Sequence, residues 1–376
     1  MFAFAPSPRV RPSPFYEATV ADGVKGFTVY NHMCLPVGFG DPAAEYDRLM
    51  NGVSLWDVAA ERQVEIKGPD AARLVQTLSA RDMSKCAIGQ GKYTPMCNRD
   101  GILVNDPIVL KLADDHFWVS IADSDVKLMA EGIAYGQNLN VKVGEPDVSP
   151  LALQGPKAVE VVAHVVGDWV RDLKYFWFRE TEIDGIPVVV QRSGWSKQGG
   201  FEVYLRDGSK GTQLYNIFNE AGKAWGIGPG NPNNMERIES GLVSVGTDTD
   251  DTTNPFEVRL EKFVNLDIDA DVIGLDALRR IHAEGPKRHT LGVVFDDNKE
   301  SEFANASFYA DVRWQSASRN GKPVGHVTAT TPSIRMGKII GFALVNRADA
   351  NIGDSIEVTN GRGEVSQATL VDIPFV

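Results

Sequence analysis

The stretch from residue 188 to 205, VVVQRSGWSKQGGFEVYL, contains side chains that suit ligand binding better than turn formation. Two runs typical of strands, Val188–Arg192 and Gly200–Leu205, enclose a seven-residue turn. Trp195 and Lys197 lie in this turn, and Glu202 follows just inside the second run. A structural turn requires neither an indole nor an ammonium group nor a carboxylate. We therefore predict that this hairpin faces a ligand.

Other acidic and aromatic residues extend the same chemistry. Aromatic faces can stack on a flat heterocycle, and a carboxylate can accept paired N–H donors from it. For each aromatic residue taken singly, packing in a core is as good an interpretation as ligand binding. For Asp106, the alternative to a role in the site is a structural position in a turn or at a strand edge. The residues that join the hairpin in this set are Trp56, Glu61, Tyr93, Asp106, Trp177 and Phe178.

The motifs of other catalytic classes are missing from the sequence. There is no GxSxG elbow, and no histidine accompanies Ser193 or Ser196, which argues against a serine nucleophile. The histidines form no HExxH motif and the three cysteines form no CxxC pair, so we expect no metal site. The segment GIGPGNPNN, residues 226–234, does not have the spacing of a nucleotide-binding loop and is typical of a turn that leads into a helix.

Charge and composition restrict the possible partners. The chain has 376 residues, with 50 acidic and 38 basic side chains and a net charge of −12. No basic block is long enough to follow a phosphate backbone, so nucleic acid is not an expected partner. No stretch of 18 apolar residues occurs, and the first residues lack the apolar run of a signal peptide. We expect a soluble cytoplasmic protein that binds no membrane.

An internal repetition indicates how the chain is organised. VEIKGPDAARLVQTL, residues 64–78, and LALQGPKAVEVVAHV, residues 151–165, each combine a short strand, a Gly-Pro pair and an apolar-periodic helix. Proline fits a first helical turn, and the glycine allows the chain to bend away from the strand. Between the two copies, GILVNDPIVLKL and DHFWVSIAD alternate as half-buried strands, which predicts a mixed sheet with helices on one face. The repeated unit therefore predicts two related α+β lobes.

The last quarter of the chain has a different pattern. GKPVGHVTA, IIGFALV and DSIEVTN are short strand-like runs separated by Gly, Asn and Pro, as in a small β-barrel or sandwich. We expect the change near residue 285. The predicted domains are thus residues 1–148, 149–284 and 285–376.

Five segments resemble, in the same order, the aminomethyltransferase family, the tetrahydrofolate-dependent T-proteins of glycine cleavage. The resemblance spans nearly the whole chain, through DVAAERQVEIKGPDA, GILVNDPIVLKL, LALQGPK, RSGWSKQGGFEVYL and TTNPFEVRLEKFV. It implies a three-domain cloverleaf, with two related α+β lobes and a C-terminal small β-barrel around a central funnel for folate.

The family pattern also implies contacts to tetrahydrofolate. The family has two adjacent aspartates beside the folate, and this chain has Asn105 followed by Asp106. The T-protein segment GYTGEDGFE corresponds to GWSKQGGFE here, so the pterin-binding glutamate corresponds to Glu202 and the tyrosine to Trp195. The expected folate contacts are Asp106, Tyr93, Glu202, Trp195 and Phe178.

Two departures concern the methyl donor. The family's GARD segment is NPNN here, which places Asn233 where an arginine is expected, and SHMGE is AAERQ, which places Glu61 where a methionine is expected. We therefore do not expect aminomethyl transfer from a lipoyl carrier.

Within the family, GVKGFTVYNHM, SIADSDV and ERIESGL are most similar to the sulfonium demethylases. This implies transfer of one methyl group from dimethylsulfoniopropionate to tetrahydrofolate, which yields 3-methylthiopropionate and 5-methyltetrahydrofolate. Asp106 is the expected catalytic residue, since it can stabilise charge on the pterin or help the N5 proton leave. Either Lys197 or Arg62 is expected to bind the substrate carboxylate. The expected substrate contacts are Tyr30, Glu61, Trp177, Trp195, Lys197 and Arg62.

Two alternatives remain open from the sequence. A related demethylase for a methylated amine or betaine also needs an aromatic cage for a cation. A folate-binding accessory protein of iron–sulfur assembly resembles the same family, but its cysteine-containing KGCYxGQE segment is replaced here by GLVSVGTDTDDTTNPFE. The oligomeric state is expected to be a monomer or homodimer.

Overall fold

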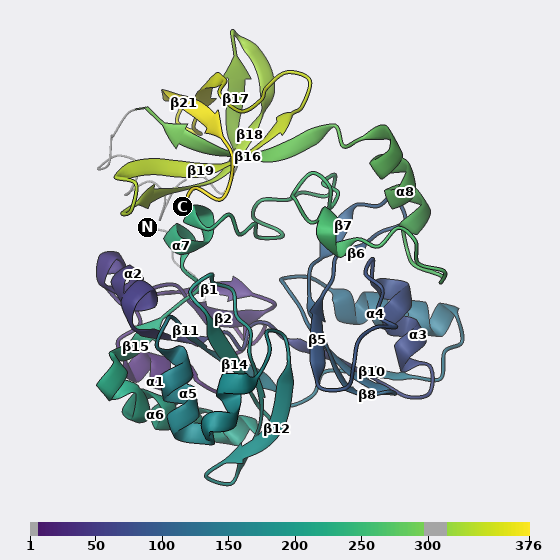
Figure 1. The fold of residues 1–376 in the computed structure, drawn as a ribbon, viewed down its shortest axis with the longest axis vertical. Helices are drawn as coiled ribbons and strands as arrows, with labels where there is room; N and C mark the ends of the chain where they lie inside the picture. Colours follow the sequence, from purple (N-terminus) through teal and green to yellow (C-terminus); the bar gives the residue numbers. More distant parts are fainter. Residues whose placement is uncertain (1–6, 297–313) are drawn as a thin grey trace.

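The computed structural model describes residues 7–296 and 314–376. Figure 1 shows three bodies: a lobe built on a six-stranded sheet, a lobe built on a five-stranded sheet, and a closed six-stranded barrel at the top of the view. This arrangement confirms the predicted fold of two α+β lobes and a C-terminal barrel.

The six-stranded sheet combines strands from distant parts of the chain. Its outer face is covered by three helices, α1 (Tyr16–Ala21), α5 (Ala158–Val166) and α6 (Gly211–Ala221), which share one apolar cluster with it. Only β3 and β15 are parallel; the other neighbours are antiparallel. In spatial order the strands are β12 (Phe178–Ile183), β13 (Ile186–Gln191), β14 (Gly200–Leu205), β11 (Ser149–Gln154), β3 (Val53–Asp57) and β15 (Ile227–Gly230).

The five-stranded sheet is antiparallel throughout, so the predicted mixed sheet between the two repeat copies is wrong. Most of its neighbouring strands come from separated parts of the chain, so their relative direction has no local signal in the sequence. Helices α3 (Ala71–Leu78) and α4 (Val126–Gly136) cover its outer face. In spatial order the strands are β10 (Lys142–Gly144), β4 (Gln63–Lys67), β9 (His116–Ser120), β8 (Ile108–Ala113) and β5 (Gln90–Tyr93).

The expected boundary at residue 148 does not separate the two sheets. Strand β3 precedes the whole five-stranded sheet in the chain, yet it lies between β11 and β15 in the six-stranded sheet. The segment from residue 58 to 62 then crosses from one lobe to the other. Pairing between strands so far apart leaves no local pattern in the sequence, which is why the division was not predicted.

The repeated strand–helix unit is present in both lobes, as β4 with α3 and as β11 with α5. Gly68 and Gly155 occupy equivalent bends with φ of +136° and +126°. A Cβ at Gly68 would lie 2.6 Å from the Asn140 carbonyl oxygen, and one at Gly155 would lie 2.5 Å from that of Gly52. Both bends therefore require glycine. The prolines that follow come before the N-cap residues rather than inside the first helical turn, which corrects that detail of the prediction.

The inner faces of the two sheets pack on each other. Strand alternation directs Phe201, Val203 and Leu205 of β14 to the helices, and it directs Glu202 and Tyr204 to the other sheet. The cluster between the sheets is formed by Leu110, Trp118, Val148, Phe178, Val189 and Tyr204. The edge strand β5 also bonds the other lobe through its backbone, since the Gly91 N–H donates to the Phe176 carbonyl at 2.6 Å.

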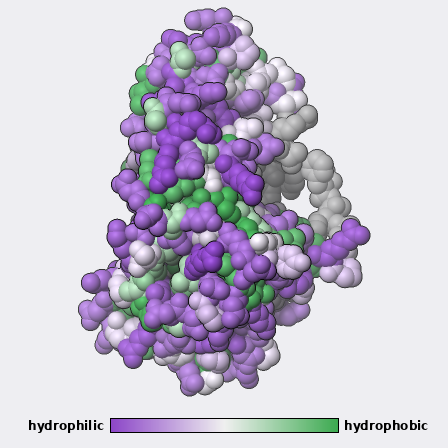
Figure 2. Space-filling model, turned by 90° about the vertical axis from the view of Figure 1, so that its right-hand side faces the viewer, coloured by the Kyte–Doolittle hydropathy of each residue, from purple (hydrophilic) through white to green (hydrophobic). Residues whose placement is uncertain are grey.

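The barrel is closed, and its strands surround an apolar core. It begins at Arg288, close to the expected change near residue 285. On the face in Figure 2, hydrophobic residues gather around the middle of the molecule and hydrophilic ones cover its two ends. In spatial order the strands are β16 (Arg288–Phe295), β19 (Lys338–Asn346), β18 (Lys322–Ser333), β17 (Gln315–Arg319), β20 (Ser355–Thr359) and β21 (Val365–Val371).

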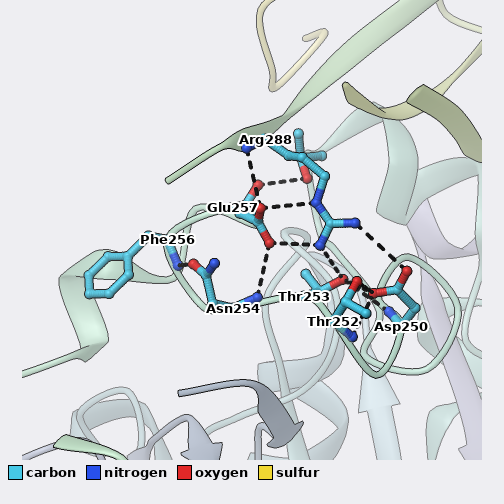
Figure 3. A network of polar contacts seen from close by, with 8 residues as sticks. Asp250, Thr252, Thr253, Asn254, Phe256, Glu257 and Arg288 are labelled. Carbon is cyan, nitrogen blue, oxygen red and sulfur yellow. Dashed lines mark hydrogen bonds and ion pairs between the residues drawn. The ribbon is translucent and has the colours of Figure 1, made fainter. Parts of the chain in front are cut away.

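A polar network joins the barrel to the segment that precedes it (Figure 3). Glu257, which is 3% exposed, accepts hydrogen bonds from the Arg288 Nε at 2.9 Å and its Nη2 at 2.8 Å. The same carboxylate accepts from the Asn254 N–H at 3.1 Å. Asp250 lies 3.7 Å from the guanidinium on its other side. This network fixes the first barrel strand against the lobes.

The remaining elements are connections at the centre and edges of the molecule. Helix α7 lies between the six-stranded lobe and the barrel, and α8 lies beside the five-stranded lobe (Figure 1). The helices are α2 (Pro42–Asn51), α7 (Asn234–Glu239) and α8 (Leu275–Glu284), with short 3-10 turns η1 (Asp168–Asp172), η2 (Gly208–Lys210), η3 (Gly222–Trp225) and η4 (Glu261–Phe263). The strands are β1 (Phe27–Tyr30), β2 (Met33–Pro36), β6 (Met96–Cys97) and β7 (Leu103–Asn105).

Candidate active site

Three carboxylates meet where the chain passes between the two sheets. Glu61 lies on the segment that crosses from β3 to β4, Asp106 lies between β7 and β8, and Glu202 lies on the inner face of β14. Burial raises the pKa of Glu61 well above its usual range, and the negative charges of Glu202 and Asp106 raise it further. The three groups therefore share one environment, although they come from distant parts of the chain.

Glu202 is fixed by two donors on one of its oxygens. The Ser193 hydroxyl donates to Oε2 at 2.5 Å and the Tyr204 hydroxyl donates to it at 3.1 Å. The side chain is 3% exposed, and burial raises its pKa in spite of these two donors. Among the described residues, no donor is recorded for Oε1. This second oxygen is available to a ligand.

Asp106 is held by Tyr93 at the end of β5. The Tyr93 hydroxyl donates to Asp106 Oδ2 at 2.8 Å, and the Tyr93 ring packs edge-on against Phe263 at 4.6 Å between centroids. Burial raises the pKa of Asp106 to about 7, and the Tyr93 hydrogen bond opposes that rise. Near neutral pH this carboxyl group can therefore accept or release a proton.

Tyr30 faces the same group of acids. Burial raises the pKa of its hydroxyl, and the charges of Glu61 and then Asp106 raise it further. The hydroxyl remains protonated at neutral pH and can donate a hydrogen bond. Tyr30 precedes the β1–β2 turn, where Asn31 has a φ of +49°.

Two buried asparagines hold this part of the site together. The Asn31 amide donates to the carbonyl of Ala60 at 3.0 Å, and its Oδ1 accepts from the Ser124 N–H at 3.0 Å. Asn105 donates to the Ala122 carbonyl at 3.0 Å and accepts from the Ala122 N–H at 3.2 Å. An ionised carboxylate could not donate to the Ala122 carbonyl, so Asn105 makes a contact here that an aspartate would lack.

The turn between β13 and β14 places Trp195 half-buried and Lys197 exposed. The Arg237 guanidinium lies 5.8 Å from the Trp195 ring centroid. Lys197 donates its backbone N–H to Glu236 at 3.0 Å, and no contact of its ammonium group is recorded in the described part of the chain. The side chain of Asn233, which stands where the family has an arginine, caps α7 by accepting from the Glu236 N–H at 3.0 Å.

The remaining aromatic candidates have different surroundings. Phe178 is 7% exposed and lies in the cluster between the sheets, while Trp177 beside it is half-buried and bridges to Gln90 of β5. Trp56 is 1% exposed, and its indole N–H donates to Ser54 at 2.7 Å within a core cluster. Trp56 is therefore a core residue.

Arg62 is already engaged by another acid. Its guanidinium forms hydrogen bonds with both carboxylate oxygens of Glu145, with Nε 3.0 Å from Oε1. A further N–H donates to the Asn31 carbonyl at 3.4 Å. No lysine or arginine of the described residues shifts the pKa of Glu61, Asp106 or Glu202. Burial and neighbouring acids, rather than a cation of the described residues, therefore govern the pKa values of these three carboxylates.

The structure adds residues that the sequence reasoning missed. Gln191 pairs with Glu202 across the strands, and its Oε1 lies 3.1 Å from the hydroxyl oxygens of both Ser193 and Tyr204, the two groups that hold Glu202. Tyr175 donates to the Gly194 carbonyl at 3.5 Å, and burial together with the charge of Glu202 raises its pKa to about 12. For Tyr204, the available signal in the sequence was its two-residue spacing from Glu202, since alternate residues of a strand share one face.

Within residues 7–296 and 314–376, none of the helices combines the length and the apolar composition that a membrane span requires. In the same residues, no group of three His, Cys, Asp or Glu side chains has an arrangement that could hold a metal ion.

Comparisons with known proteins agree with this architecture. The family model described as "GCVT N-terminal domain" matches residues 15–268, and "Glycine cleavage T-protein C-terminal barrel domain" matches residues 292–376. The chain belongs to the aminomethyltransferase family. The family match covers both lobes and the barrel, as the resemblance implied.

Individual relatives of this aminomethyltransferase family member include two types of enzyme. The chain is 40% identical to "Dimethylsulfoniopropionate demethylase DmdA" of Ruegeria pomeroyi over 96% of this chain and 97% of that protein. It is 30% identical to an aminomethyltransferase of Thermoanaerobacter sp. (strain X514) over 86% of each. The crystal structure of aminomethyltransferase T from Bartonella henselae superposes with a TM-score of 0.84 over 98% of each chain, at 21% identity, and supports the fold.

Proposed function

We propose that this protein is a tetrahydrofolate-dependent methyltransferase that demethylates dimethylsulfoniopropionate to 3-methylthiopropionate and forms 5-methyltetrahydrofolate. The observation that carries the proposal is the 40% identity, over nearly the full length of both chains, to a relative named dimethylsulfoniopropionate demethylase. The acidic residues between the lobes supply the chemical support.

The residues around Glu202 fit a pterin. A pterin presents a planar pair of N–H donors from its amino group and the adjacent ring nitrogen, and a fixed carboxylate can accept both. Ser193 and Tyr204 hold Glu202 through Oε2, and Oε1 has no donor recorded in the described residues. The proposed folate contacts are Glu202, Tyr93, Trp195, Phe178 and Asp106.

The charge of the site favours a cationic donor. Glu61 and Asp106 are carboxylates whose negative forms are disfavoured by burial. A sulfonium bound beside them would supply the positive charge that the protein itself does not provide there. Aromatic faces such as those of Trp195 and Trp177 can hold the cation at roughly 1–2 kcal/mol per good contact, without localising its charge.

The transfer itself requires positioning more than activation. A sulfonium is a good leaving group: the C–S bond breaks, its electron pair stays on sulfur, and the methyl group passes to the acceptor. Tetrahydrofolate, when bound, supplies N5 as that acceptor and loses one proton. Asp106 is the proposed base for this proton, because its pKa of about 7 allows it to be ionised and then protonated near neutral pH.

The substrate carboxylate needs a cation. Arg62 is paired with Glu145, whereas the ammonium group of Lys197 is exposed on the turn beside Trp195. We therefore favour Lys197 over Arg62 for this contact. The remaining proposed substrate contacts are Tyr30, Glu61, Trp177 and Trp195.

We further propose that the protein acts in the cytoplasm without a metal, as a monomer or homodimer, and that residues 285–376 form a separate domain.

The proposal is tested by a comparison of donors. The purified protein is incubated with tetrahydrofolate and either dimethylsulfoniopropionate or glycine betaine, and both products are measured by mass spectrometry. We expect 3-methylthiopropionate and 5-methyltetrahydrofolate in equal amounts from the sulfonium, with little turnover of the betaine. Turnover of the betaine alone would indicate an amine demethylase, and folate binding without turnover of either donor would indicate an accessory protein.

A further inference from the structure

Arg237 lies at the point where the turn, the barrel and the connecting segment meet. Its guanidinium carbon is 5.8 Å from the centroid of the Trp195 ring and 5.7 Å from that of Phe342 on barrel strand β19. The side chain is 4% exposed. Both distances are within the range of a cation–π contact, so the cation lies over a ring of the site and a ring of the barrel.

We propose that Arg237 is a positioning residue that fixes the indole of Trp195 for the donor cation, and that the barrel contributes to the active site through this contact. The inference rests on the proposed function, because it takes Trp195 as a wall of the donor site. Since the guanidinium covers one face of the indole, the other face is the one offered to a ligand.

The guanidinium is held by its edges, which leaves its flat faces for the rings. Its Nη1 donates to Asp248 at 2.8 Å and to the Leu242 carbonyl at 3.2 Å, and its Nε donates to Asn234 at 2.7 Å. Asp248 is in turn fixed by the hydroxyl of Thr328 on barrel strand β18, at 2.7 Å. The orientation of Arg237 is therefore set by both the connecting segment and the barrel.

Asp248 also balances the charge of Arg237. An unpaired cation behind the indole would compete for the same ring electrons that a donor cation uses on the opposite face. The Asp248 side chain is fully buried and pairs directly with the guanidinium. The pair can thus hold the ring without presenting a net positive charge to the donor.

The neighbouring residue of α7 fixes the backbone of the same turn. Glu236 Oε1 accepts from the Lys197 N–H at 3.0 Å, from the Gln198 side-chain amide at 3.0 Å and from Ser240 at 2.7 Å. Glu236 is 1% exposed. One short helix thus sets both the backbone of the turn, through Glu236, and its indole, through Arg237.

The test compares two arginines that both contact the barrel. Arg237→Met removes the contact with Trp195, and Arg237→Lys keeps a positive charge for Asp248 but loses the flat guanidinium. The control is Arg259→Met, because Arg259 bonds the barrel at the Thr290 and Ile373 carbonyls, at 3.1 and 2.9 Å, and has no recorded contact with the turn. For each variant the KM for dimethylsulfoniopropionate, the Kd for tetrahydrofolate and the melting temperature are measured.

We expect Arg237→Met to raise the donor KM about tenfold, while the folate Kd changes less than twofold. The donor KM of Arg237→Lys should lie between those of Arg237→Met and the native protein. Arg259→Met should leave the donor KM unchanged even if it lowers the melting temperature. If Arg237→Met does not fold, Arg237→Lys serves for the same comparison.

A double-substitution cycle separates positioning from general stability. In a Trp195→Phe background, Arg237→Lys should cause a smaller increase in the donor KM than it does alone. Equal increases in both backgrounds, or equal effects of the Arg237 and Arg259 variants, would overturn the inference while leaving the proposed function intact. If Trp195→Phe itself leaves the donor KM unchanged, Trp195 is not part of the donor site, and both that assignment and the inference fail.

Discussion

At the scale of single residues, the site depends on carboxylates that are costly to bury. Glu61, Asp106 and Glu202 each have a raised pKa because burial penalises the charged form. A cationic donor would relieve this cost, whereas a neutral or anionic ligand would not. The types of these residues in the sequence led to the prediction of a site for a flat polar heterocycle, which the folate titration below tests.

The ionisation of Asp106 predicts the pH dependence of activity. Its pKa is raised to about 7, so below that pH the folded enzyme carries a protonated carboxyl group that cannot accept the N5 proton. The value of kcat/KM should rise with pH up to about 7 and then level off. We expect Asp106→Asn to lower kcat/KM by roughly a hundredfold or more and to remove this inflection. A native profile that is flat from pH 5.5 to 8 would show that Asp106 is not the base.

Glu202 offers a test of folate binding. Ser193 and Tyr204 both donate to Oε2, so Glu202→Gln can keep these contacts and place its amide nitrogen at the Oε1 position. That nitrogen would face another donor on the pterin, at a cost of roughly 1–3 kcal/mol. Tetrahydrofolate affinity should fall about tenfold, as measured by titration calorimetry. Glu65→Gln is the control, because Glu65 bonds His116 and Trp118 instead; unchanged affinity in the Glu202 variant would exclude the pterin contact.

At the scale of elements, the local units could be predicted and their long-range pairing could not. Strand β14 runs from Gly200 to Leu205 as expected, and both Gly-Pro units join a strand to a helix. The position of β3 in the other lobe's sheet could not be inferred, since its neighbours β11 and β15 are distant in sequence. The contacts of Ser193, Gln191 and Tyr204 with Glu202 likewise arise only once β13 and β14 are paired.

The equivalent bends of the two repeat units give a prediction at this scale. Gly155→Ala would place a Cβ 2.5 Å from the Gly52 carbonyl oxygen at a φ of +126°. We expect a loss of roughly 2 kcal/mol or more in unfolding free energy, measured by urea denaturation. Gly144→Ala is the matched control, because a Cβ there meets nothing within 4 Å. Equal stabilities of the two variants would show that the bend does not require glycine.

At the scale of the whole molecule, both an apolar cluster of Ile238, Ile340, Phe342 and Ile373 and a set of polar contacts attach the barrel to the preceding segment. Glu257 and Arg288 form the central pair, with the Glu257 carbonyl also accepting from the Thr290 N–H at 2.8 Å (Figure 3). Family resemblance implied the presence of the barrel. The resemblance did not reveal how α7 and the Glu257–Arg288 pair place the barrel against the turn that carries Trp195.

The Glu257–Arg288 pair predicts a loss of stability in each single variant, and the two losses should not be additive in the double variant. Glu257→Ala leaves Arg288 with Asp250 at 3.7 Å as its remaining acidic partner and should reduce the unfolding free energy by roughly 2–4 kcal/mol. Glu257→Ala combined with Arg288→Met should lose less than the sum of the two single variants, because the double variant removes both charges of the pair whereas each single variant leaves one of them without its partner. Additive losses in chemical denaturation would mean that the pair does not act as a unit.

The central claim, methyl transfer from a sulfonium to folate, is tested most directly by following the methyl group itself. The native protein is incubated with tetrahydrofolate and dimethylsulfoniopropionate that carries ¹³C in its S-methyl groups, and the products are observed by NMR. The proposal predicts one labelled methyl on N5 of 5-methyltetrahydrofolate for each labelled 3-methylthiopropionate formed. Unlabelled folate and intact dimethylsulfoniopropionate after prolonged incubation, with a protein that still binds folate, would contradict it.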